Sequence, residues 1–194
     1  MQRTVTKTTK QLATTAHHEA GHAVACIFAR GQRISFRQVS IVPDDAQGSL
    51  GRVLQKHYPA WLRHEWQSGY PSPRAVRAAE NQAVVLLAGR AAAARHRGRG
   101  GSWGSAVYCN DPEHGRVIVA GDVKHAVDYL DLISTGDPEE TELLFPLADY
   151  RARRLVEARW QYIGKLAAEL LARRALTERG VDEVLFGELR EAAQ

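Results

Sequence analysis

The stretch Ala16-His17-His18-Glu19-Ala20-Gly21-His22-Ala23-Val24-Ala25 holds a His-Glu-x-x-His pattern inside a run of residues that favours a helix. On a helix, His18 and His22 lie one turn apart on the same face, so both imidazoles can reach one zinc ion at roughly 2.0–2.1 Å. Glu19 then stands beside the metal, where its carboxylate can take a proton from an activated water and deliver it to a leaving amine. The pattern therefore predicts the site of a metal-dependent hydrolase.

The surroundings of this pattern decide how much weight it carries, because three fixed residues occur by chance in about one per cent of chains of this length. Alanines and apolar residues continue the helical run, Thr14 or Thr15 can cap its start, and Gly31 suits its end. The alternative is that His18 and His22 are ordinary histidines of an amphipathic helix. The helical context favours the metal site.

The composition limits the classes of protein to which this chain can belong. At 194 residues with 44% hydrophobic residues, the chain suits one domain with a substantial core. The net charge of +4 comes from 26 basic residues against 22 acidic ones, a small excess, so a nucleic-acid partner is not expected. No apolar run is long enough for a signal peptide or a membrane span. Only Cys26 and Cys109 are present, which argues against a disulfide framework and favours a reducing, cytoplasmic setting.

A strand is predicted for residues 33–42, where Ile34, Phe36, Val39 and Ile41 are separated by polar residues. An exposed strand edge near a metal site would hold an extended peptide through main-chain pairing. A strand that simply packs against the metal helix is an equally good interpretation of the pattern.

Helices are expected over most of the remaining chain. Ser72-Pro73 starts one that runs to about residue 94, with serine at the cap and proline in the first turn. Asp137-Pro138 starts another, and a last short helix covers roughly residues 181–190. Residues 57–73 look irregular or only partly helical. His57 and His64 lie there as possible additional ligands, although a histidine outside a motif is more often a bystander.

Asp122 opens a further helix and has two possible roles. Aspartate at the start of a helix is usually a cap. A catalytic zinc ion, however, takes three protein ligands and a water, and two histidines leave it one ligand short. Asp122 is therefore a candidate for the third ligand.

Several of these motifs, in this order, resemble the peptidase domain of the FtsH/AAA-type membrane-anchored zinc metalloproteases. The resemblance extends from about Leu12 to about Leu185. It rests on the segments His18–Ala23, Val39–Pro43 followed by Gly48, Ala88–Ala92, Asp122–Ala126, Leu166–Leu171 and Leu176-Thr177.

The resemblance implies a mainly helical, zincin-like fold with a small strand element and a C-terminal helical bundle. It also implies Zn²⁺ bound by His18, His22 and Asp122, Glu19 as the catalytic base, and a polypeptide substrate. We expect a flexible segment at residues 1–11 and one domain at 12–194, with the metal site in 12–136 and the C-terminal helices in 137–194. A separate ATPase or other copies of the chain are the partners that the family suggests.

Three features depart from the family. The chain begins 17 residues before His18 and carries no ATP-binding loop, so we expect it not to pull folded substrates apart by itself. Ala93 and Ala94 stand where the family usually continues with glutamate. The spacing of 100 residues from His22 to Asp122 is long for the family, which leaves Asp111 as a rival ligand. Asp122 is preferred because a helical Val-x-x-Ala follows it, whereas Pro112 follows Asp111.

The leading prediction of function is a zinc metallopeptidase that hydrolyses unfolded or flexible polypeptides. A catalytically silent zinc-binding or regulatory module derived from such a peptidase is the alternative, and the Ala93 departure favours it. A nucleic-acid-binding role, suggested by the basic run Arg95–Arg99, ranks third.

Overall fold

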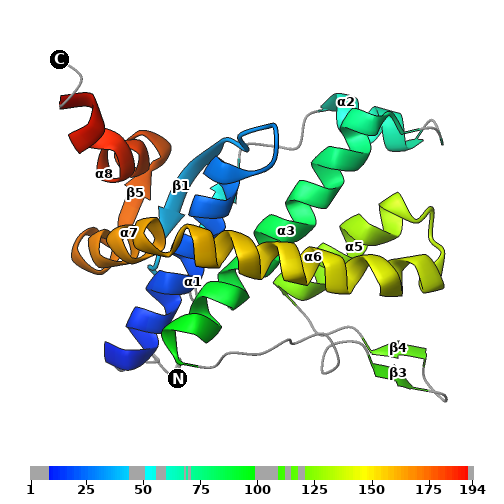
Figure 1. Ribbon diagram of the computed structural model, residues 1–194, viewed down its shortest axis with the longest axis horizontal. Coiled ribbons are helices and arrows are strands. Elements are labelled where there is room, and N and C mark those ends of the chain that lie inside the picture. Colours follow the sequence, from blue (N-terminus) through cyan, green and yellow to red (C-terminus); the bar gives the residue numbers. More distant parts are fainter. Residues whose placement is uncertain are drawn as a thin grey trace, which may run out of the picture.

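Helices make up most of the fold, as the sequence predicts (Figure 1). The computed structural model describes residues 9–43, 51–55, 60–67, 69, 71–98, 109–111, 115–117 and 121–191, and for 60–63, 109–111, 115–117 and 188–191 it describes the backbone alone. The helices are α1 (Thr9–Phe28), α2 (Ala60–Gln67), α3 (Pro73–His96), α5 (Asp122–Ile133), α6 (Pro138–Ala158), α7 (Trp160–Arg173) and α8 (Glu178–Glu191). The strands are β1 (Phe36–Ser40), β2 (Arg52–Gln55), β3 (Cys109–Asp111), β4 (Gly115–Val117) and β5 (Ala175–Thr177).

The centre of the fold is the contact between α1 and α3, which cross where both helices carry small residues (Figure 1). A Cβ on Gly21 would lie 2.7 Å from the Ala92 Cβ and 2.8 Å from the Ala88 carbonyl oxygen. Real Cβ atoms do not approach so closely, so only glycine allows the two backbones to pack at this distance. Gly21 of the His-Glu-x-x-His segment therefore sets the helix crossing that places the histidines.

The start of α1 differs from the prediction. The helix begins at Thr9, within the segment expected to be flexible, rather than at a cap near Thr14 or Thr15. The hydroxyls of these two threonines donate to the carbonyls of Lys10 and Gln11, one turn earlier in the same helix. Threonine hydroxyls bond in this way inside helices as well as capping them, so their presence alone does not mark a helix start.

The other predicted helix starts agree better with the structure. Ser72 caps α3, where its hydroxyl accepts from the Ala75 amide, and Pro73 follows it. Asp137 caps α6 by accepting from the amides of Glu139 and Glu140. At α5 the cap position is Gly121, with φ near +87°, and Asp122 is the first helical residue. The Asp122 carboxylate is thus directed elsewhere than to the helix end.

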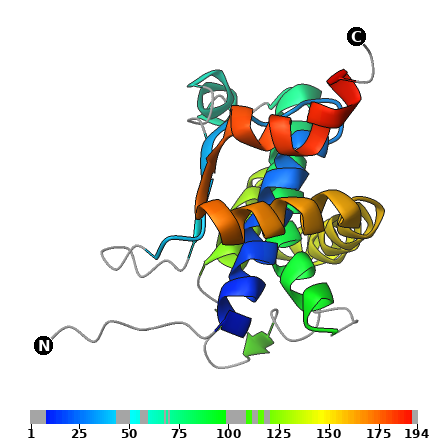
Figure 2. The ribbon, with the colours of Figure 1, turned by 90° about the vertical axis from the view of Figure 1, so that its left-hand side faces the viewer.

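A three-stranded antiparallel sheet lies beside α1, in the order β2-β1-β5. β1 pairs with β2 on one side, with Val39 opposite Val53, and with β5 on the other, with Val39 opposite Leu176. Figure 2 shows β5 connecting α7 to α8, so the C-terminal part of the chain returns to complete the N-terminal sheet. β3 and β4 form a separate hairpin.

Two apolar clusters lie on different sides of α3. The larger joins α1, the sheet, α7 and α8, and includes Val24, Phe36 and Leu166. The smaller joins α3 to α5 and α6 around Leu87, Leu130 and Phe145. The helix α6 runs continuously through Pro146. In the part of the chain that the structure describes, no helix combines the length and the apolar character needed to cross a bilayer.

Candidate metal centre

Three potential metal ligands meet at the contact of α1, α3 and α5. The Nε2 atoms of His18 and His22 are 3.0 Å apart, and Oδ2 of Asp122 lies 3.0 Å from the first and 3.2 Å from the second. The three donor atoms thus form a nearly equilateral triangle, although Asp122 is 100 residues from His22 in sequence. The helical spacing of i and i+4 brings the two histidines together, and the packing of α5 against α3 brings Asp122 to them.

A hydrogen bond on the side of the His22 ring away from the cluster sets the orientation of the ring. Its Nδ1 donates to the Val85 carbonyl at 2.8 Å, since a carbonyl can only accept, and this leaves a lone pair on Nε2 toward the cluster. Gly89 supplies the space for the ring, because a Cβ there would lie 2.3 Å from Nε2 and 2.5 Å from Cε1 of His22. α3 therefore both anchors His22 and makes room for it.

The cluster is strongly coupled electrostatically. Burial alone would lower the pKa of His22, but the hydrogen bond with Asp122 and the charges of Asp122 and Glu19 raise it to about 9. Burial lowers the pKa of His18. Burial would raise the pKa of Asp122, but its hydrogen bonds with both histidines hold it far below the usual range. The Asp122 carboxylate is therefore charged. Its negative charge favours either a proton on His22 or a cation bound in place of that proton.

These residues suit a metal ion. Ligands about 2.0–2.1 Å from a tetrahedral ion lie roughly 3.3 Å from one another, close to the observed triangle. The set offers one charged oxygen and two imidazole nitrogens, and the hydrogen bond of His22 to Val85 supplies the outer support that metal-binding histidines usually have. His18, His22 and Asp122 can therefore hold a metal ion together.

Glu19 lies next to this cluster, between it and the sheet. Its side chain is buried, with 5% of its surface exposed, and its charge contributes to the raised pKa of His22. A Cβ on Gly51 would lie 2.8 Å from both Cγ and Oε1 of Glu19, and 2.9 Å from the Ser40 carbonyl oxygen. Gly51, directly before β2, thus allows the backbone to pass close to the carboxylate. Glu19 borders both the metal ligands and the strand that follows Gly51.

A cavity of about 740 Å³ opens over the three ligands and Glu19. Its size lies within the usual range for ligand sites. The residues of β2 line one side of it, and Arg90, Arg97 and His125 line another. A substrate placed there would reach the metal ligands, the buried carboxylate and the edge of the sheet at once.

The predicted position of the peptide-binding edge is wrong. β1, which covers half of the predicted strand at 33–42, is the central strand and has β2 and β5 on its two sides. Its backbone groups are already paired, so it cannot add an extended substrate. The edge strand of the sheet beside the cavity is β2, and its Arg52, Val53 and Gln55 line the cavity. This strand was not predicted from the sequence.

The remaining candidates do not enter the described cluster. His64 is exposed on α2 and does not line the cavity. His57 lies outside the described residues, and for Asp111 only the backbone is described, in β3 opposite Gly115. Gly51 and Gly89 are the residues whose importance the sequence analysis missed. A glycine gives no local signal in the sequence that its missing Cβ makes room for a distant imidazole.

A comparison of the chain with models of known protein families finds no match, and a comparison with curated proteins finds none either. The functional assignment therefore depends on the geometry of the site and on the motifs of the sequence.

Proposed function

We propose that this protein is a zinc metallopeptidase that cleaves unfolded or flexible polypeptides, similar to the peptidase domain of the FtsH/AAA-type proteases. The observation that carries the proposal is the convergence of His18 Nε2, His22 Nε2 and Asp122 Oδ2 to within 3.0–3.2 Å of one another. Two imidazoles and one carboxylate are a donor set that suits zinc and leaves a fourth position for water or substrate. The buried Glu19 next to them supports hydrolysis rather than a purely structural metal site.

In this proposal His18, His22 and Asp122 hold the ion, and a bound zinc ion supplies Lewis-acid chemistry that acidifies water and polarises a peptide carbonyl. Glu19 takes the proton of the attacking water and passes it to the nitrogen of the leaving amine as the peptide bond breaks. Its burial and the close approach of Gly51 hold the carboxylate in place at the wall of the cavity.

The substrate is proposed to bind in an extended form along β2. This strand is at the end of the sheet in the described part of the chain, it lines the cavity, and it begins next to Glu19. Main-chain pairing with a strand edge recognises any unfolded segment, since it does not depend on side chains. A peptide on β2 would bring successive carbonyls past Glu19, which suits an endopeptidase of broad specificity.

The proposal is tested with Glu19→Gln, in which the carboxylate base is replaced by an amide of the same shape. We expect the variant to keep its zinc and to cleave casein about 10²- to 10⁴-fold more slowly, the range over which a general base contributes. Bound zinc is measured by elemental analysis and cleavage with and without a chelator. Glu183→Gln, which changes an exposed glutamate on α8, is the matched control and should cleave like the parent.

Two results would contradict the proposal. Cleavage by Glu19→Gln at the rate of the parent would exclude Glu19 as the base. Zinc in both proteins with cleavage in neither would identify a silent zinc-binding module.

A further inference from the structure

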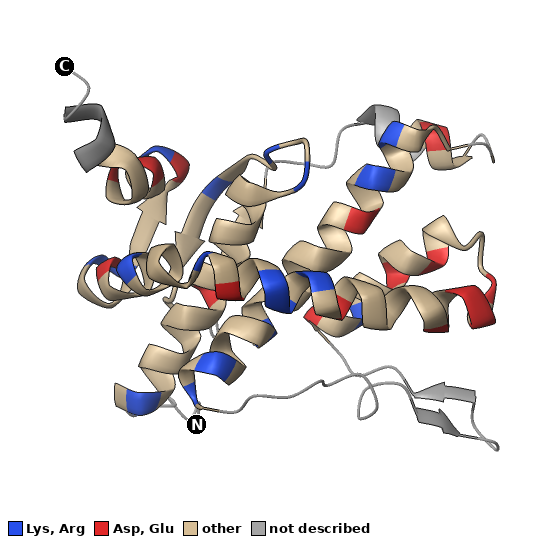
Figure 3. Cartoon of the chain, in the orientation of Figure 1, with Lys and Arg blue, Asp and Glu red and all other residues tan. Residues whose placement is uncertain are grey.

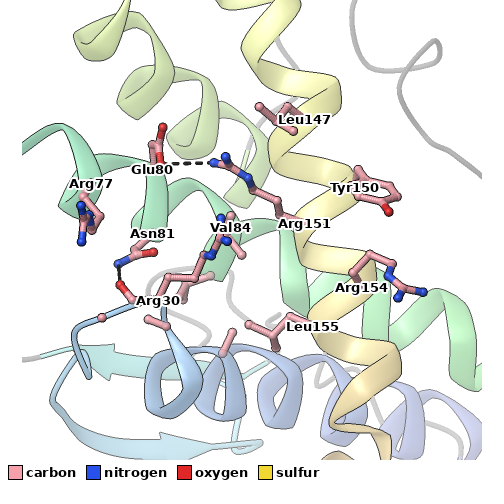
Figure 4. Close-up of a pocket in the computed structure, with 14 residues that line it drawn as sticks. Arg30, Arg77, Glu80, Asn81, Val84, Leu147, Tyr150, Arg151, Arg154 and Leu155 are labelled. Atoms are coloured by element: carbon pink, nitrogen blue, oxygen red, sulfur yellow. Dashed lines mark hydrogen bonds and ion pairs between the residues drawn. The ribbon is translucent and has the colours of Figure 1, made fainter.

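A second cavity, of about 860 Å³, is shown in Figure 4, and His18, His22 and Asp122 do not line it. It is bounded by the end of α1 with the turn after it, the first half of α3, and α6. Its volume is within the range of small-molecule sites. Val85 lines both cavities, so the residue whose carbonyl orients His22 also forms part of the wall of this second cavity.

The lining combines an apolar floor with a surplus of positive charge. Ala25 and Val85 are buried in the floor, and Leu155 is partly buried beside them. Four arginines but a single acidic residue, Glu80, line the cavity. Figure 3 shows basic residues on the middle of α6 and along α3, while α6 carries acidic residues at its start and again at Asp149 and Glu157. Such a lining suits an anion that carries an apolar part.

Two of the four guanidinium groups are already paired. Arg151 contacts Glu80 at 3.2 Å across the space between α6 and α3 (Figure 4). Arg154 contacts Glu157 at 3.0 Å on its own helix. Within the described residues, neither Arg30 nor Arg77 has an acidic partner. Two guanidinium groups of the cavity are therefore not compensated by any carboxylate of the described part of the chain.

The turn after α1 brings Arg30 to the part of α3 that carries Arg77. Nδ2 of Asn81 donates to the Arg30 carbonyl at 3.0 Å, which attaches this turn to α3. Gly31 continues the turn with φ near +73°, and the Nη1 atom of Arg77 lies 3.6 Å from where a Cβ on Gly31 would stand. In Figure 4 the Arg30 side chain extends toward Val84, and Arg77 lies on the other side of Asn81. Both arginines line the same cavity.

We propose that this cavity binds a small organic phosphate. A phosphate monoester carries about −1.5 to −2 charges at neutral pH, which matches two guanidinium groups, and its oxygens suit their forked donors. The apolar floor would take the organic part of the ligand. A carboxylate carries one charge and would leave one arginine uncompensated. This proposal does not depend on the proposed peptidase activity, because none of its arginines lines the metal cavity.

The test is isothermal titration of the full chain with phenyl phosphate, inorganic phosphate and benzoate at low salt, with and without zinc. Phenyl phosphate should bind most tightly, because it alone offers both two charges and a ring. Arg30→Gln/Arg77→Gln should weaken its binding at least about tenfold, since each charged hydrogen bond is worth about that factor. Arg179→Gln, which changes a highly exposed arginine on α8, is the matched control and should bind like the parent. Thermal unfolding checks that the variants fold.

The phosphate could also contact zinc, and Asp122→Ala separates the two sites. If the proposal is correct, this variant binds phenyl phosphate as the parent does. Binding that is lost in Asp122→Ala but kept in Arg30→Gln/Arg77→Gln would place the anion at the metal ligands and overturn the proposal. Benzoate binding as tightly as phenyl phosphate, or no binding of phenyl phosphate at millimolar concentration, would overturn it as well.

Discussion

The two faces of α3 are built in different ways. On the face toward α1, Gly21 and Gly89 let backbone and imidazole approach so closely that no side chain fits between them, and the polar groups there are paired. On the face toward α6, a cavity remains open, and two of the arginines that line it have no acidic partner among the described residues. The first face holds donor atoms in fixed positions, as metal binding requires, whereas the second offers charge without a fixed geometry. One helix can thus support a rigid site and an adaptable one.

The largest effect that separates the two faces is expected for Gly89→Ala. The new methyl group would overlap the His22 ring, displace its Nε2 and abolish zinc binding, at a cost of about 1–3 kcal/mol in the free energy of unfolding. Elemental analysis and thermal unfolding measure both quantities.

Two substitutions serve as controls for this comparison. Gly164→Ala in α7 has open space around the new methyl group and should stabilise the protein by about 0.5–1 kcal/mol. Glu80→Gln, on the other face of α3, breaks a partly exposed ion pair and should cost less than about 1 kcal/mol with zinc retained. Zinc retention in Gly89→Ala would show that His22 does not need the space that Gly89 provides.

A smaller effect is expected from pH, and it too differs between the faces. Zinc must displace the proton of His22, whose pKa is raised to about 9, so the apparent affinity for zinc should rise about tenfold per pH unit up to about pH 9. Arginine stays protonated throughout this range, so phenyl phosphate binding should not change between pH 7 and 9. Titrations with zinc and phenyl phosphate at pH 7, 8 and 9 measure both slopes.

The same proton affects the stability of the metal-free protein. Because the folded-state pKa of His22 lies above the ordinary histidine value of 6.5, its contribution to stability is fully present below pH 6.5 and is lost as the pH rises through about 9. The thermal unfolding temperature of chelator-treated protein should therefore fall over this window, and zinc should restore it. A zinc affinity independent of pH would mean that His22 is not a ligand.

How much of the site could be predicted from the sequence depends on how far apart in the chain the interacting residues lie. His18, Glu19 and His22 are one helical turn apart, so their proximity is a local property that the pattern carries directly. Asp122 was chosen over Asp111 through motif resemblance, because no local rule relates residues 100 positions apart. The structure places Asp122 next to both histidines.

The errors arose where distant parts of the chain meet. The edge of the sheet was misplaced because β5, from the C-terminal part, covers β1, and the alternation of residues 33–42 does not reveal how many neighbours a strand has. The arginine cavity was not anticipated, since its guanidinium groups come from α3, α6 and the residues just after α1. Nothing in the sequence distinguishes Arg30 and Arg77 from other arginines. They line one cavity because the turn after α1 packs against α3.

The most direct test of the metal centre is a zinc titration of the parent, Asp122→Ala and Asp111→Ala, with circular dichroism to verify folding. Changes in groups that only support a ligand cost about 10–100-fold in metal affinity, so removal of the Asp122 carboxylate itself should cost more than about a hundredfold. Asp111→Ala should bind zinc as tightly as the parent. Unchanged zinc affinity in Asp122→Ala, or loss of zinc in Asp111→Ala alone, would contradict the assignment of His18, His22 and Asp122 as the metal ligands.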